Sequence, residues 1–133
     1  MQYRWLLAIV LLIGTALPVP AAERVLDFAS TVRIQQDGAL LVTEKITVEA
    51  EGQQIKRGIV REFPTRYTDA KGRTVRVGFE LLRVERDGRP EPHHTANLDN
   101  GVAIYAGHKD VFLRPGRYAY TIEHRTTRQL GFF

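Results

Sequence analysis

A two-residue alternation of apolar and polar side chains extends from Leu40 to Val48 and restricts this segment to a β-strand. Its apolar members share one face of that strand: Leu40, Val42, Ile46 and Val48. The preceding run, Val25–Ile34, is also rich in β-branched and aromatic residues, and residues 36–38 between the two runs read Gln-Asp-Gly. Because Asp and Gly favour tight turns, the two runs predict a long β-hairpin.

Further β-strand signals follow at short intervals along the chain. Strands are expected over Val75–Arg86, Val102–Tyr105 and Arg117–Thr127. Residues 55–67 are expected to be irregular, and residues 91–101 to form a polar loop. No segment repeats apolar residues at i, i+3, i+4 and i+7, the spacing of an amphipathic helix. The pattern predicts an all-β fold, a single antiparallel β-sandwich-like domain.

The first 22 residues have the order of charged, apolar and small residues that a secretory signal peptide requires. Arg4 is followed by thirteen mostly apolar residues, Trp5–Leu17, and two prolines and a pair of alanines end the segment. The apolar run is shorter than the ~20 residues that a membrane-spanning helix needs, which disfavours an uncleaved anchor. Residues 1–22 are therefore predicted to be a cleaved signal peptide, with cleavage after Ala21 or Ala22.

Export would place residues 23–133 in the periplasm or on the outer face of the cell membrane. The sequence contains no cysteine, so the exported domain is expected to rely on its apolar core and strand pairing rather than on disulfides. The hydrophobic fraction of 44% and the charged fraction of 26% are ordinary for a globular protein. Disorder is therefore not expected over most of the chain.

The formal net charge is +4, and basic and acidic residues alternate along the sequence. The chain has no block of like charges of the kind that predicts nucleic-acid binding. We therefore expect no nucleic-acid partner. The small basic excess fits an ordinary solvated surface, and attraction to anionic lipid head groups is the alternative.

The residue types that carry catalysis are few and scattered. Ser30 is the only serine, and the sequence has no Gly-x-Ser-x-Gly motif. His93 and His94 are adjacent, so they point to opposite sides of an extended chain, and no two histidines have the spacing of a zinc site. We expect no enzymatic activity, no metal and no other cofactor. His124, on an apolar strand face, is expected to be partly buried and hydrogen-bonded.

Glu44 is unusual because it falls on the apolar face of its predicted strand. A carboxylate in that position is costly unless it is paired. The segment 56–64 offers Arg57 and Arg61 as partners, and arginine can bind a carboxylate through two parallel hydrogen bonds. We expect a structural ion pair that holds this segment over the sheet. Recognition of an anionic ligand is the alternative.

Several aromatic residues in or near the predicted strands could line a sugar-binding groove. They are Tyr67, Tyr105, Phe112, Tyr118 and Tyr120. Aromatic residues in strands more commonly belong to the core or form cross-strand pairs, and that role is the one expected here.

Four segments of the chain resemble the motifs of one family. They are Asp37–Glu44, Arg57–Pro64, Glu85–Pro90 and Gly116–Ile122, and they occur in the family's order over nearly the whole segment after residue 22. The family is a set of predicted bacterial membrane proteins that carry domain of unknown function 2207. The position of His124 and Arg125, where the family often has an aromatic residue, departs from its pattern.

The resemblance implies a signal sequence, then an extracytoplasmic β-rich domain, then transmembrane helices and a cytoplasmic tail. The apolar end of the sequence, Leu130–Phe133, fits an outer domain that continues into such helices. The resemblance to the family implies no catalytic or binding residues. The expected function is a non-catalytic extracytoplasmic domain that is attached to the membrane and contacts another envelope protein or component. A carbohydrate-binding module and a small hydrolase are the alternatives, and the ligand remains open.

Overall fold

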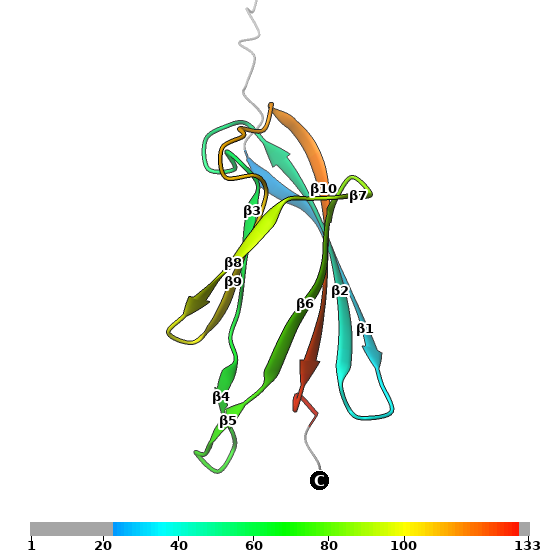
Figure 1. Cartoon of the computed structure of the whole chain (residues 1–133), viewed down its shortest axis with the longest axis vertical. Helices are drawn as coiled ribbons and strands as arrows, with labels where there is room; N and C mark the ends of the chain where they lie inside the picture. The colour runs from blue at the N-terminus through cyan, green and yellow to red at the C-terminus, as the bar shows by residue number, and fades with distance from the viewer. Residues whose placement is uncertain (1–22, 131–133) are drawn as a thin grey trace, which may run out of the picture.

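Ten strands make up the regular structure of residues 23–130, the part of the chain that the computed structural model describes (Figure 1). Their bounds are β1 (Arg24–Ile34), β2 (Leu40–Ala50), β3 (Ile59–Phe63), β4 (Arg66–Thr68), β5 (Thr74–Arg76), β6 (Gly78–Arg86), β7 (Arg89–Pro90), β8 (His93–Leu98), β9 (Gly101–Ala106) and β10 (Gly116–Thr127). These residues contain no helix, so the predicted all-β class is confirmed. The predicted signal peptide and the apolar end at Phe132 and Phe133 lie outside the described residues.

The strands form two facing sheets and a short ribbon. The larger sheet has the order β1-β2-β10-β6-β7, the smaller sheet the order β3-β9-β8, and β4 pairs with β5. Every pairing is antiparallel. In Figure 1 the two sheets approach each other at the end where β7 lies and diverge toward the end that carries the β4–β5 ribbon. The result is a sandwich that is closed at one end.

The predicted hairpin is confirmed as β1 and β2, which pair along their length around the turn at residues 35–39. The Gln35 N–H donates to the Ala39 carbonyl at 2.8 Å. The Asp37 carboxylate accepts from the Ala39 N–H at 2.9 Å, the local bond that makes Asp a turn residue.

The core lies between the sheets, and five strands, β2, β3, β6, β9 and β10, supply inward-facing residues to it. The buried members of this cluster are Ile46 and Val48 from β2, Ile59 from β3, Val84 from β6, Ile104 and Ala106 from β9, and Tyr120 and Ile122 from β10. β1 contributes no buried residue. The smaller sheet therefore covers the middle of the larger one and leaves its β1 edge uncovered.

Three sequence-based expectations about local structure are wrong. Residues 55–67, expected to be irregular, contain β3 and the first two residues of β4, and the expected loop at residues 91–101 contains β8. The expected single strand Val75–Arg86 divides at Val77, whose N–H donates to Thr65 at 2.9 Å as the chain passes from the ribbon into the larger sheet. β8 is an edge strand with mostly exposed polar residues, so it lacks the apolar alternation that predicts a strand.

Gly58 and Gly107 let the start of β3 and the end of β9 meet in direct backbone contact. Their φ angles are +152° and +143°, values that L-residues rarely adopt. A Cβ on Gly58 would lie 1.7 Å from the Ala106 carbonyl oxygen, and one on Gly107 would lie 2.0 Å from the Arg57 carbonyl oxygen. Both obstacles are backbone atoms, so no side-chain rotation relieves them. Next to this contact the Leu113 N–H donates to the Lys56 carbonyl at 2.7 Å, which holds the loop before β3 beside the loop after β9.

Gly107→Ala is expected to lower the free energy of unfolding by about 3 kcal/mol or more, because strained backbone and overpacking each cost roughly 1–3 kcal/mol. Gly52→Ala is the matched control, since Gly52 has φ +74° but a Cβ there would meet no atom within 4 Å. Its cost is expected to be only about 1 kcal/mol. Urea unfolding followed by circular dichroism measures both, and equal losses would contradict the close-contact explanation.

Candidate functional site

Glu44 and Arg61, two of the three predicted ion-pair residues, meet across the space between the two sheets. Glu44 lies on β2 with 3% of its surface exposed. The Arg61 Nη2, from β3, donates to Glu44 Oε2 at 2.6 Å and to Oε1 at 2.9 Å, and Nε donates to Oε2 at 3.1 Å. The pair is therefore a forked, charge-assisted contact of the kind that only arginine makes.

Arg57, the third predicted residue, is not part of this pair. Its guanidinium carbon lies 4.6 Å from the centre of the Phe112 ring, at the distance of a cation–π contact. The difference arises because β3 begins at Ile59, after the close backbone contact at Gly58. Arg61 is inside the strand and faces the larger sheet, whereas Arg57 lies in the loop before it.

Two aromatic rings lie against the Arg61 side of the pair. The Arg61 guanidinium carbon lies 4.8 Å from the centre of the Phe63 ring and 5.6 Å from that of Phe28. His124 is buried next to them, with its ring centre 4.6 Å from Phe63 and 4.9 Å from Phe79. We call these residues the inter-sheet cluster: Phe28, Glu44, Arg61, Phe63, Phe79 and His124.

His124 is buried, as expected, but its Nδ1 has no hydrogen-bond partner, so the expected hydrogen bond is not found at that atom. Burial, together with repulsion by the Arg61 charge, lowers the pKa of His124 to about 4. The imidazole is therefore neutral at pH 7. Because it is enclosed by aromatic rings, it serves packing rather than proton transfer to a bound molecule.

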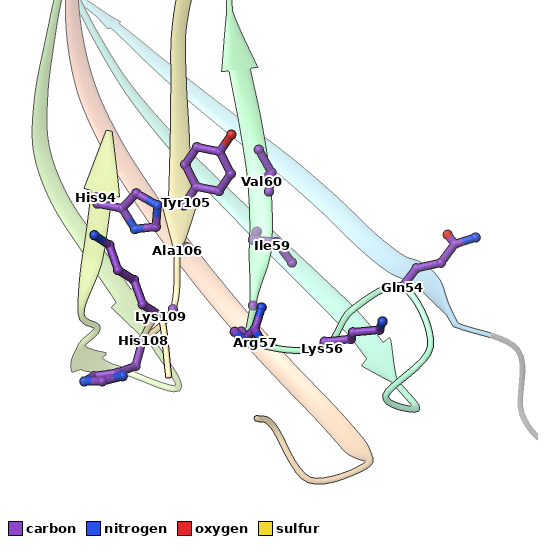
Figure 2. A pocket seen from close by; sticks show the side chains of 12 residues that line it. Gln54, Lys56, Arg57, Ile59, Val60, His94, Tyr105, Ala106, His108 and Lys109 are labelled. Carbon is purple, nitrogen blue, oxygen red and sulfur yellow. The ribbon is translucent and has the colours of Figure 1, made fainter. Parts of the chain in front are cut away.

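A surface pocket of about 430 Å³ lies at the closed end of the sandwich (Figure 2). The loop before β3, the β9 strand and the loop after it build its walls, and β8 adds one side chain. The lining residues are Gln54, Lys56, Arg57, Gly58, Ile59, Val60, His94, Tyr105, Ala106, Gly107, His108 and Lys109. The sequence alone gave no sign of this pocket, because its residues come from separate segments that the pairing of β3 and β8 with β9 brings together.

The pocket is basic. Three of its lining residues are Lys56, Arg57 and Lys109, and none of the twelve is acidic. The side chain of Lys109 extends toward the His94 ring in Figure 2, and that ring stacks on Tyr105 with a centre separation of 4.6 Å and an interplanar angle of 1°. Such an arrangement attracts an anionic group and gives it several donors.

Glu23 holds the loop that carries Gln54, Lys56 and Arg57. Its carboxylate accepts four backbone hydrogen bonds, from Glu51 at 2.9 Å, Gln53 at 2.7 Å, Gln54 at 2.5 Å and Ile55 at 3.0 Å. Desolvation alone would raise the pKa of Glu23, but these four bonds lower it to about 2. The carboxylate therefore stays ionised at pH 7 and fixes one wall of the pocket.

The five predicted aromatic residues do not form one groove. Tyr120 is in the core, where burial raises its pKa to about 12. Tyr118 packs against the core edge, and Tyr105 lies in the pocket. Tyr67 and Phe112 are exposed on the β4–β5 ribbon and on the loop before β10. The expected role, in the core or in a cross-strand pair, therefore holds for Tyr120, for Tyr118 at the margin, and for Tyr105, which stacks on its cross-strand neighbour His94.

The histidines are spread over different parts of the structure. His94 and His108 line the pocket, His124 is in the inter-sheet cluster, and His93 Nδ1 lies 2.9 Å from the Glu91 carbonyl. Across residues 23–130, no three His, Asp or Glu side chains come together as a possible metal site. The pocket's chemistry therefore rests on its cationic side chains.

Comparison with known proteins identifies the class of this domain. Residues 24–133 match the family model described as the N-terminal domain of predicted membrane protein DUF2207. The chain belongs to this family, as the resemblance of its motifs indicated.

A curated relative is uncharacterized protein YciQ of Escherichia coli (strain K12). It is 32% identical over 108 residues, which cover 80% of this chain but only 17% of YciQ. The present chain thus corresponds to a small part of the length of that relative. No solved structure matches the chain. Among residues 23–130, no helix has the length and apolar character needed to cross a membrane.

Arg61→Ala is expected to lower the free energy of unfolding by about 3 kcal/mol, because it leaves a buried carboxylate without its partner. For a domain of this size that corresponds to a fall in Tm on the order of 10 °C. Arg57→Ala is the control, since it removes the same charge outside the pair and is expected to cost less than about 1 kcal/mol. Thermal unfolding followed by circular dichroism measures both, and an unchanged Tm in Arg61→Ala would contradict the role of the pair.

Stability is expected to fall as the pH drops from about 6.5 to 4. In this window the unfolded chain protonates His124, whose ordinary pKa is 6.5, whereas the folded chain does not. The loss is expected to reach roughly 3 kcal/mol. His124→Phe keeps an aromatic ring beside Phe63 and Phe79 and should flatten this part of the pH profile. Parallel profiles for the two proteins, measured by urea unfolding, would show that another group is responsible.

Proposed function

We propose that this domain is a non-catalytic interaction module on the extracytoplasmic side of the membrane. Its basic pocket would bind an anionic group, a carboxylate or a phosphate, on another component of the cell envelope. The observation that carries the proposal is the gathering of Lys56, Arg57 and Lys109 around one pocket that has no acidic lining residue.

The pocket's construction supports binding of a fixed anion. Arg57 is stacked on Phe112, which limits the freedom of its guanidinium before a ligand arrives. The four hydrogen bonds to Glu23 and the backbone bond from Leu113 to Lys56, at 2.7 Å, order the same loop. An ordered site loses less conformational entropy when it binds. The pocket therefore has the properties of a preformed anion site.

The position of the pocket favours a partner away from the membrane surface. In Figure 1 the loops at residues 51–58 and 107–115 lie at one end of the domain, and the last described residues, after β10, lie at the other. The family's description as predicted membrane proteins fits transmembrane helices that follow this domain. With that arrangement the pocket points away from the lipid head groups and toward the other components of the cell envelope.

The two alternatives receive less support. A carbohydrate-binding face is typically a row of exposed aromatic rings, whereas Tyr67 and Phe112 are in separate parts of the described structure. A hydrolytic site needs a nucleophile or paired carboxylates. The lining residues of the pocket include no serine, threonine, cysteine, Asp or Glu.

Calorimetric titration of the exported segment, residues 23–133, at low salt tests the proposal, because the apolar run of the predicted signal peptide would itself bind vesicles. The probes are inorganic phosphate, a hexaglutamate peptide and vesicles that contain phosphatidylglycerol. Binding of phosphate or peptide is expected, and Arg57→Ala or Lys109→Ala should weaken it about tenfold, the effect of one charged hydrogen bond. Lys71→Ala, which removes a charge from the exposed turn between β4 and β5, is the matched control.

Three results would contradict the proposal. The first is no binding of any probe, and the second is an equal loss of affinity in Lys71→Ala, which would indicate a general charge effect. Binding to the vesicles alone would place the ligand on the membrane and refute the proposed orientation. Circular dichroism of each variant confirms that it is folded before the affinities are compared.

A further inference from the structure

β1 is an edge strand of the larger sheet. It pairs only with β2 and is eleven residues long. The opposite side of its backbone is therefore available for pairing with another strand, a state that proteins usually shield because it promotes association. A bulge interrupts the pairing with β2 between Val25 and Asp27, so the regular part of the edge is residues 27–34.

The uncovered part of β1 is apolar on the side that faces the core. Phe28 lies opposite Ile46 and Val32 lies opposite Val42, so these side chains continue the core face of β2. They are nevertheless exposed, because the smaller sheet does not extend over β1. The exposed fractions are 59% for Val25, 50% for Phe28, 54% for Val32 and 65% for Ile34.

We propose that β1 pairs with β1 of a second copy of this chain, antiparallel and centred on Ser30. The two larger sheets would then form one continuous sheet through a twofold axis. This interface is separate from the basic pocket, which lies on the smaller sheet and its loops, and the inference does not depend on the proposed function.

The sequence of β1 is complementary to itself in this register. With Ser30 opposite Ser30 of the second copy, Asp27 lies opposite Arg33 and Phe28 lies opposite Val32. Opposite charges and aromatic–β-branched pairs are the cross-strand contacts that stabilise antiparallel sheets. The twofold axis produces each pair twice. Across residues 23–130, neither Asp27 nor Arg33 has an ion-pair partner in its own chain.

Other registers lose this complementarity. If the pairing is centred on Ala29 or on Thr31 instead, the core faces of both copies still lie on the same side of the combined sheet. Within residues 27–34, however, neither of these registers places an acidic residue opposite a basic one. A register that paired odd with even residues would turn the apolar face of one copy to the solvent side. The charges therefore select a single register, which favours a second copy over an unrelated strand.

Cysteine trapping tests the register directly, because the chain contains no other cysteine. Ser30→Cys would put two thiols at directly opposite positions, where the Cα separation of about 4.5–5.5 Å suits a disulfide. Under mild oxidation this variant is expected to form a covalent dimer. Lys45→Cys, on the outward side of β2, is the control and should remain largely uncrosslinked. Equal crosslinking of the two variants, or none in Ser30→Cys, would overturn the proposed register.

Charge reversal tests the interface without a covalent bond. Sedimentation velocity of the wild-type chain is expected to show a concentration-dependent dimer. Asp27→Arg or Arg33→Asp should each weaken it about tenfold, because each change creates two like-charged pairs. The double variant should recover the wild-type affinity. A wild-type chain that stays monomeric would overturn the proposal. A dimer whose affinity is unchanged by both charge reversals would also overturn it, because the interface would then lie elsewhere.

Discussion

The ion pair between Glu44 and Arg61 is the contact on which the arrangement of the two sheets depends most directly. It joins the centre of β2 to the centre of β3; the Arg61 guanidinium lies over the Phe28 and Phe63 rings, and Phe79 and His124 pack against Phe63. A buried carboxylate costs several kcal/mol unless its partner is correctly placed. The pair therefore penalises any other placement of β3 over the larger sheet, whereas apolar contacts alone tolerate small shifts.

The placement of β3 also determines the site. Arg61 holds β3 over β2, and β3 pairs with β9 up to the close backbone contact at Gly58 and Gly107, where no side chain fits. This pairing brings Arg57 and Lys109 to one pocket, and Glu23 holds the loop between β2 and β3 in place. The position of β3 and the shape of the pocket are thus linked, because Ile59 and Val60 of β3 and the loop before it line the pocket.

The smaller sheet also explains the exposed edge. It covers β2, β10 and β6, where the buried core residues are, and ends before β1. Phe28 is consequently only half covered, although it takes part in the inter-sheet cluster through Arg61. A second β1 strand would extend the sheet where this chain has no cover of its own. The proposed self-pairing edge therefore results from the incomplete overlap of the two sheets, whereas the pocket is built within the smaller sheet and its loops.

The amino-acid sequence by itself determined the β class, the β1–β2 hairpin and β10, because alternation and turn residues are local signals. It also indicated that Glu44 needed a cationic partner, since a charge on an apolar face is visible in the pattern. It did not reveal β8, whose polar residues lie on an edge, and it did not separate Arg61 from Arg57 as the partner. Only the tertiary structure decided those points, together with the basic pocket and the exposed face of β1. Each of them depends on which segments, distant in sequence, the packing of two sheets brings side by side.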